Sequence, residues 1–157
     1  MEHRKVSGIL IAAGVMAAAG GAAVMLGFAP AGMAQVREAY PALAWVFWPG
    51  LLFIWLVGGL CAGALWQYFR ISVRIGAGKS FCAANARDMA RIAALLFDAA
   101  GLVLAASGAL LIFGLGPIWL FLLLIGMAIG AMGLLAYALS RLLARAVQLQ
   151  EENDLTV

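Results

Sequence analysis

Charged side chains are scarce in this sequence. They make up 11% of its 157 residues, and 66% of the residues are hydrophobic. A soluble domain, by comparison, contains about 25% charged residues. A water-soluble fold of this length cannot bury so much apolar surface, so lipid must surround most of the chain. The formal net charge of +3 does not indicate nucleic acid, because the basic residues flank apolar runs, where they orient membrane spans and meet anionic lipid.

Residues that bind metals or carry out redox chemistry are also rare. His3 is the only histidine, which argues against a bis-histidine haem and against a histidine-based zinc site. Cys61 and Cys82 form no Cys-x-x-Cys pair, and we expect no structural disulfide between them. The sequence contains no nucleophile–base pair, no paired carboxylates within a span, no metal-ligand cluster and no phosphate loop. It therefore predicts a protein that is not an enzyme and has no cofactor.

Four apolar runs predict four transmembrane helices, over residues 6–28, 43–69, 92–113 and 118–139 of a single transmembrane domain. At a rise of ~1.5 Å per residue, each run is long enough to cross a hydrocarbon layer of ~30 Å. The first run is too long for the apolar region of a signal peptide, which has ~7–15 residues, so we expect a retained helix.

The segments between these runs carry turn signals. Pro30, Gly32 and Pro41 predict a loop over 29–41. Ser80 is expected to cap the third helix, which should begin in water around Phe81 and enter the bilayer near Ile92. Residues 114–117 predict a tight, uncharged turn before the last span.

The distribution of Lys and Arg predicts the orientation of the chain. Nine of the ten lie in the amino-terminal segment, in the central segment 70–91 or after residue 139, and only Arg37 lies on the other side. The positive-inside rule then places both termini and the central loop in the cytoplasm. The expected fold is an all-α, integral membrane four-helix bundle with cytoplasmic extensions of the third and fourth helices.

Asp98 is the one ionisable residue well inside a predicted span. A carboxylate at that depth is costly, so it should face protein or water rather than lipid. Two interpretations are open: a proton or cation site of a transporter, or an ion pair with a basic group at the membrane boundary. The second is favoured, because Asp98 lies two turns beyond Arg91 and within reach of Arg70 or Arg74 on the neighbouring helix.

Basic residues gather in the central segment and in the helix that follows the last span. They are Arg70, Arg74, Lys79, Arg87 and Arg91 in the central segment, and Arg141 and Arg145 in the last helix. Such residues bind anionic lipid headgroups or an acidic partner, or they serve only to orient the spans, and all three interpretations are open. Asp88 is the single acid of the central segment.

Three small-residue pairs match the close-packing pattern of membrane helices. They are Gly59-x-x-x-Gly63, Gly126-x-x-x-Gly130 and, more weakly, Gly101-x-x-x-Ala105. The pattern predicts helix contact, either within one bundle or across a homodimer interface. Because the chain has 19 glycines, lipid-facing glycines that match by chance are a third interpretation.

The last helix is expected to continue past the membrane as an amphipathic helix. Its apolar face holds Leu135, Leu139, Leu142, Ala146 and Leu149, while Arg141, Arg145, Gln148 and Glu152 line another face. The chain then closes in an acidic tail, 151–157. A disordered end, docking of the free carboxylate in a partner's groove and folding back onto the basic loop are all open for this tail.

Several stretches resemble the small four-span bacterial membrane proteins grouped as domain of unknown function 2975. They are 40–44, which leads into the second span, 66–70 at its end, 78–81 with 85–87 before the third, and the ending Glu152-Asn153-Asp154-Leu155-Thr156-Val157. The resemblance implies a four-helix membrane protein of the bacterial inner membrane without an established activity. It also implies a partner, a small cytoplasmic helix-turn-helix regulator. Asp98 is not part of the family pattern.

Three hypotheses for function follow. The leading one is a non-enzymatic regulatory or interaction protein that works with a cytoplasmic helix-turn-helix regulator through 70–91 and the helix from Arg141 to the tail, without binding nucleic acid directly. The second is a small transporter or channel that uses Asp98. The third is a subunit of a larger membrane complex.

Overall fold

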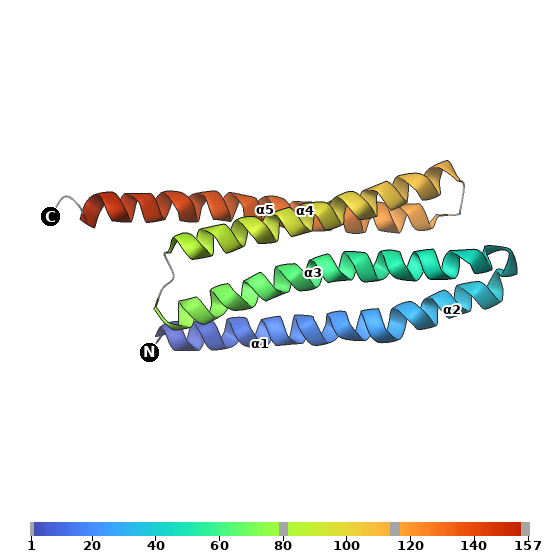
Figure 1. Ribbon diagram of the computed structural model, residues 1–157, viewed down its shortest axis with the longest axis horizontal. Helices are drawn as coiled ribbons and strands as arrows, with labels where there is room; N and C mark the ends of the chain where they lie inside the picture. The colour runs from blue at the N-terminus through green and yellow to red at the C-terminus, as the bar shows by residue number, and fades with distance from the viewer. Residues whose placement is uncertain (1, 79–81, 114–116, 155–157) are drawn as a thin grey trace.

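The computed structural model describes residues 2–78, 82–113 and 117–154, and this part of the chain is almost entirely helical (Figure 1). Helix α1 (Glu2–Ala23) continues through a π-helical turn, η1 (Val24–Phe28), into α2 (Ala29–Ala39). After the 3-10 turn η2 (Pro41–Val46), the chain returns as α3 (Phe47–Gly76). Helices α4 (Ala83–Ile112) and α5 (Ile118–Asp154) form a second antiparallel pair.

Four helical stretches are long and apolar enough to cross a bilayer. They are Lys5–Ala39, Ala44–Gly76, Ala83–Ile112 and Ile118–Gln150. Large apolar side chains cover much of their outer surface; Ile9, Leu26 and Phe121 are examples, each at least two-thirds exposed. Lipid is the solvent that accepts such a surface. The prediction of an all-α protein with four membrane-length helices is therefore confirmed, and it indicates a multi-pass membrane protein.

The predicted loop over 29–41 is wrong, because residues 29–39 are helical. Pro30 stands in the first turn of α2, and the wider π-helical turn 24–28 directly precedes it. There the Ala29 N–H donates to the carbonyl of Val24, five residues back. Proline in an α-helix lacks an N–H and collides with the carbonyl four residues earlier. A π-helical turn at this point widens the backbone, so the helix passes the proline without ending.

Two further helix ends differ from the expected ones. Helix α3 continues to Gly76, seven residues beyond the predicted end of its span, and so carries Arg70 and Arg74 on a regular helix. Helix α4 has Cys82 at its N-cap, in an extended conformation and without a side-chain cap hydrogen bond. Ser80, which was expected to cap it, and Phe81 lie outside the described residues.

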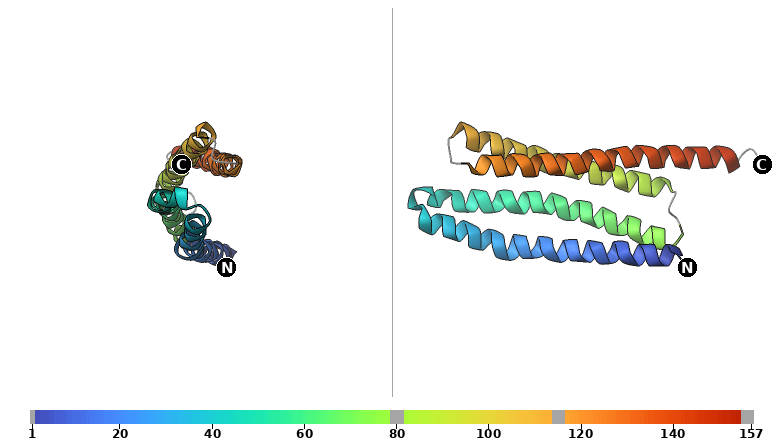
Figure 2. Two further views of the ribbon diagram at one scale, coloured as in Figure 1. Left: turned by 90° about the vertical axis from the view of Figure 1, so that its right-hand side faces the viewer. Right: turned by 180° about the vertical axis from the view of Figure 1, so that it is seen from behind.

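The sequence predicts a four-helix bundle, and in the structure the four helices are arranged as an open row. Helix α1 contacts α3, α3 contacts α4 and α4 contacts α5, whereas in the described part of the chain no contact joins α1 to α4, α1 to α5 or α3 to α5. Viewed end-on, the helices lie along an arc (Figure 2). In lipid no hydrophobic force closes such an arc, because the lipid tails are as apolar as the side chains they cover.

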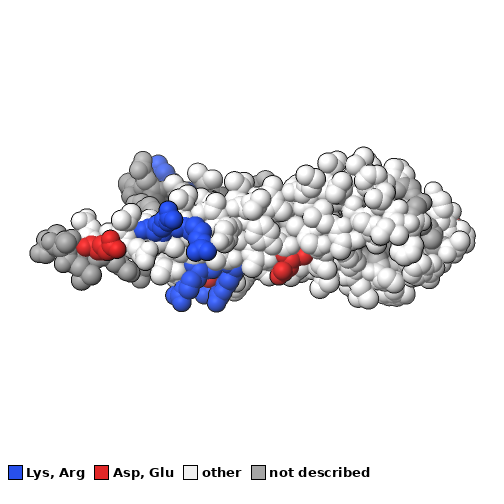
Figure 3. Space-filling model, turned by 90° about the horizontal axis from the view of Figure 1, so that it is seen from above, with Lys and Arg blue, Asp and Glu red and all other residues white. Residues whose placement is uncertain are grey.

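One end of the row is polar. Helix α1 begins there, the connection between α3 and α4 lies there, and α5 runs beyond all of the other helices before it ends (Figure 1). Lys and Arg side chains gather at this end, while most of the rest of the face seen in Figure 3 is uncharged. We call it the polar end; the residues that build it are the last turns of α3, the first turns of α4 and the second half of α5.

Candidate functional site: an arginine cluster around Asp88

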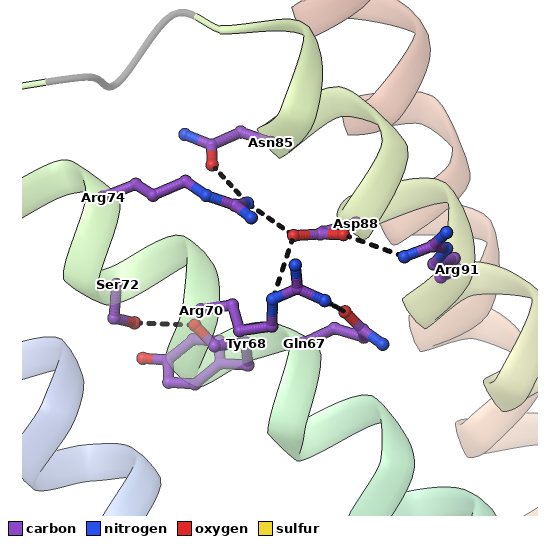
Figure 4. A network of polar contacts seen from close by, with 8 residues as sticks. All are labelled: Gln67, Tyr68, Arg70, Ser72, Arg74, Asn85, Asp88 and Arg91. Carbon is purple, nitrogen blue, oxygen red and sulfur yellow. Dashed lines mark hydrogen bonds and ion pairs between the residues drawn. The ribbon is translucent and has the colours of Figure 1, made fainter.

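The candidate site lies at the polar end, where α3 ends and α4 begins. Arg70 and Arg74 are four residues apart and project from one face of α3. On α4, Asn85 and Asp88 are three residues apart and share a buried face, with Arg91 one further turn along. The two helices run antiparallel, so these two short polar stretches come to the same level and face each other (Figure 4).

Asp88 is the centre of this cluster. Its Oδ2 accepts a short hydrogen bond from Nη1 of Arg74 and lies 4.0 Å from Nε of Arg70. Its Oδ1 lies 3.5 Å from Nη1 of Arg91. Arg74 also donates to Oδ1 of Asn85 at 3.3 Å, and Arg70 donates to Oε1 of Gln67 at 3.5 Å. One carboxylate therefore holds three guanidinium groups from two helices (Figure 4).

Burial makes this carboxylate the structural anchor of the cluster. The side chain of Asp88 is 4% exposed, whereas those of Arg74, Arg70 and Arg91 are 25%, 44% and 62% exposed. A buried carboxylate needs a cationic or hydrogen-bonding partner, because its removal from water costs several kcal/mol. The arginines supply that partner, and their outer N–H groups still face the surroundings of the protein.

Asp88 was expected only as the single acid of the central segment, and its role in this cluster was not predicted. A signal was present: Asn85, Asp88 and Ile92 follow one another at spacings of three and four, which places them on one helix face. Ile92 is buried, so the two polar residues on its face must be buried too. Two buried polar side chains need polar partners, and the arginines at the end of the preceding helix are the nearest ones in the sequence.

Asp98 does not form the expected ion pair. Arg70 and Arg74 bind Asp88 instead, and Asp98 is exposed and has no ion pair within the described residues. Helix geometry explains the error. Ten residues separate the two acids, so Asp98 lies roughly 15 Å farther along α4 and about 80° around it from Asp88. That position is too deep and faces away from the arginines of α3.

The other predicted basic residues lie apart from this cluster or at its edge. Arg141 donates to the hydroxyl of Tyr137 one turn earlier on α5, from Nε at 3.1 Å and from Nη2 at 2.9 Å. Arg87 lies between two hollows, one at the junction of α3 and α4 and one at that of α4 and α5. Arg145 is exposed on α5, and Lys79 lies outside the described residues.

The glycine pairs divide into two kinds. A Cβ at Gly126 would come within 2.8 Å of the Leu104 side chain, and one at Gly130 would lie 3.7 Å from Cβ of Ala100, so both glycines bring α5 close to α4. Gly63 faces Leu95 of α4 at 3.3 Å. Gly59, in contrast, faces open space. The Gly126 pair therefore lies in a contact within the molecule, and only one member of the Gly59 pair does.

The tail motif continues α5. Glu152, Asn153 and Asp154 are helical, and α5 runs straight to Asp154 at the far tip of the polar end (Figure 1). As far as Asp154 the chain therefore does not fold back onto the loop between α3 and α4. The helix persists because the sequence from Arg141 to Asp154 contains neither Gly nor Pro. Leu155, Thr156 and Val157 lie outside the described residues.

The described part of the chain thus defines an all-α, multi-pass membrane protein with a buried acid–arginine cluster at one end of its helices. The chain belongs to the family described as "Protein of unknown function (DUF2975)", whose family model matches residues 31–157. The predicted resemblance is confirmed. The match contains α3, α4, α5 and the whole arginine cluster, and it begins within α2, so α1 precedes it. No curated protein and no solved structure matches the chain.

Proposed function

We propose that the chain is a non-enzymatic interaction protein of the bacterial inner membrane that works with a cytoplasmic helix-turn-helix regulator. Its polar end and both termini would lie in the cytoplasm. The observation that supports this is the convergence of charge: nine of the ten Lys and Arg residues belong to segments at one end, and Arg37 alone belongs to the other. Short loops rich in Lys and Arg remain on the cytoplasmic side of bacterial membranes.

The free end of α5 supplies the surface that a protein partner would bind. Leu142 and Leu149 are 63% and 67% exposed, seven residues apart on one face. Arg145 lies between them in sequence, and Glu152 follows near the tip. An exposed amphipathic helix with two leucines on one face is suited to lie in an apolar groove of a partner.

The orientation is tested with the native cysteines. Cys82 lies at the start of α4 and is partly exposed. In a Cys61→Ala background, a membrane-impermeant maleimide should label Cys82 in inside-out vesicles and leave it unlabelled in intact spheroplasts. The matched control is Ala39→Cys at the opposite end, in a chain that lacks both native cysteines, which should show the reverse pattern. Labelling of Cys82 in spheroplasts would overturn the orientation.

The partner is tested by co-expression with a small helix-turn-helix regulator from the same genome, followed by recovery of that regulator with the membrane fraction. Leu142→Glu combined with Leu149→Glu should abolish recovery, because two charges replace the apolar face. A chain truncated after Gln150 measures how much the acidic tail contributes to recovery of the regulator. Unchanged recovery would exclude the tail from the contact. Arg37→Gln is the control at the other end. No recovery with the full-length chain would overturn the proposal.

The two other hypotheses are tested by the same preparations. Asp98 lines neither of the two hollows at the polar end, so little in the described structure favours a transporter. If the chain were one, proton- or ion-driven flux in vesicles would be lost in Asp98→Asn. A subunit of a larger complex would instead co-purify with a stable membrane partner.

A further inference from the structure

A hollow opens beside Asp88 on the outer side of the junction between α3 and α4. Its volume is about 250 Å³, and it is lined by Arg70, Arg74, Ala84, Arg87, Asp88 and Arg91. Every lining side chain except that of Ala84 carries a charge. Four guanidinium groups against one carboxylate leave a net charge of +3 in a space that is only a few water molecules wide.

The protein supplies few acceptors for these guanidinium groups. Each arginine carries five N–H donors. Within the described residues, the acceptors that they reach are the two oxygens of Asp88, Oε1 of Gln67 and Oδ1 of Asn85. Arg87 makes no ion pair with any described residue. Most of the donors around the hollow are therefore available to an external group.

Asp88 also determines where these donors point. It draws Arg70 and Arg74 from α3 and Arg91 from its own helix towards one spot (Figure 4). Its single charge cannot balance them, and guanidinium groups held this close repel one another. An anion in the hollow would remove that repulsion, and no reorganisation of the arginines would be needed to receive it.

We infer that this hollow is a binding site for a phosphate group, held by Arg87 and Arg91 of α4 together with the outer N–H groups of Arg70 and Arg74. A phosphate group fits better than a carboxylate because its oxygens are arranged tetrahedrally and can accept from arginines of both helices at once. The inference does not depend on a protein partner, so it goes beyond the proposed function and can fail without it.

The position of the hollow brings it within reach of two sources of phosphate. Ile92 follows directly after Arg91 and begins the apolar part of α4, and Trp66, which is 65% exposed, lies one turn before Arg70 on α3. Exposed Trp and the first Arg beyond an apolar span are typical of the headgroup level of a bilayer. At that level a phospholipid headgroup can enter from the membrane, and a soluble phosphate ester can enter from the water.

The test uses the purified full-length protein in neutral detergent. Phosphatidylglycerol and, separately, phosphatidylcholine are titrated, and the lipid-bound fraction is measured by native mass spectrometry. In the second arm, the melting temperature is compared in inorganic phosphate and in chloride at equal ionic strength. Arg87→Gln is the informative variant, because it removes a lining charge and leaves the contacts of Asp88 intact. Arg145→Gln removes an equal charge on α5 that does not line the hollow.

Arg87→Gln should weaken the binding of the phosphate ligand roughly tenfold, the loss expected for one charge-assisted hydrogen bond. Arg145→Gln should change it less than about twofold. Tight binding of phosphatidylglycerol alone assigns the site to a lipid headgroup, and a melting shift in inorganic phosphate that Arg87→Gln removes assigns it to a soluble phosphate. Equal weakening by both variants, or no binding in either arm, would overturn the inference.

Discussion

The pair α4–α5 and the pair α1–α3 are both antiparallel contacts in lipid, but burial and hydrogen bonds contribute to them in different proportions. Between α4 and α5 the backbones approach closely at Gly126, Gly130 and Gly133, and the α4 residues Ala93, Ala99 and Ala100 are fully buried. Between α1 and α3 burial is sparser: 6% of the most apolar window is buried in each of the first two spans, against 22% in the third and 11% in the fourth. Gly14 and Gly58 also lie against side chains of the neighbouring span there. One side chain, that of Ser107, donates a hydrogen bond from α4 to a backbone carbonyl of α5, that of Trp119, at 2.7 Å. Between the first two spans, more side chains donate to backbone carbonyls of the neighbouring span.

Three such hydrogen bonds are distributed along the contact between the first two spans. Ser7 Oγ donates to the carbonyl of Ser72 at 2.8 Å, and Tyr68 Oη donates to that of Leu10 at 3.0 Å. Farther from the polar end, Trp55 Nε1 donates to the carbonyl of Met25 at 3.1 Å. The comparison shows both means of helix association that remain in lipid, close packing of small residues and polar bonds. A third means, charge, joins the two pairs at Asp88.

The largest expected effect comes from breaking that charged junction. Asp88→Asn keeps the shape of the side chain but leaves three arginines without their carboxylate. A fully buried pair that loses one partner is destabilised by about 3–5 kcal/mol. Because the arginines here are partly exposed, we expect roughly 2 kcal/mol. Unfolding by titration with SDS in micelles measures this change.

Asp98→Asn is the matched control, since it makes the same change on the same helix at an exposed acid without an ion pair in the described part of the chain. It should leave the free energy of unfolding unchanged or raise it slightly, because a carboxylate within an apolar span is costly. Equal destabilisation by the two variants would show that the cluster around Asp88 contributes no specific stability.

The next-largest effect is expected from a substitution that forces α4 and α5 apart. Gly126→Val places a Cβ where only 2.8 Å separates it from the Leu104 side chain, so α4 and α5 must move apart. Overpacking of this kind costs about 1–3 kcal/mol. Gly101→Val, where a Cβ meets nothing within 4 Å, should change stability by less than about 0.5 kcal/mol. Similar losses in the same unfolding assay would contradict close packing as the basis of this pair.

The smallest effect is expected from removing one hydrogen bond between α1 and α3. Tyr68→Phe keeps the ring and removes the hydroxyl that donates to the carbonyl of Leu10. Interhelical hydrogen bonds in membrane proteins contribute about 0.6 kcal/mol on average, so a loss of that size is expected. Tyr40→Phe removes a hydroxyl from an exposed tyrosine and should have no measurable effect. If Tyr68→Phe is neutral as well, this hydrogen bond contributes nothing to the contact of α1 with α3.

Most of the fold could be predicted from the sequence, because length and hydropathy alone define a membrane-spanning helix. The number of spans and the helical continuation of α5 past its span follow from such local patterns. The loop at 29–41 was predicted wrongly for a local reason too: proline usually ends a helix, and a π-helical turn that accommodates Pro30 leaves no recognisable residue pattern.

The site was harder to predict than the fold. The sequence predicts that the arginines lie together at one end of the helices, but it does not predict that they surround Asp88. That pairing depends on the rotation of α3 relative to α4, which local periodicity does not determine. The open arrangement of the four helices could not be predicted for a similar reason. Apolar faces in lipid carry no signal for which of them meets protein, so an open row and a closed bundle have the same hydropathy pattern.

The open row has a consequence for the way in which the chain is assembled. Each span touches only the spans directly before and after it in the chain, so each new helix leaving the ribosome meets its partner in the span inserted just before it. No helix has to wait for a distant segment to be synthesised, and the sequence separation between contacting residues stays small, which favours rapid folding. The order of synthesis is therefore also the order of neighbours in the finished protein.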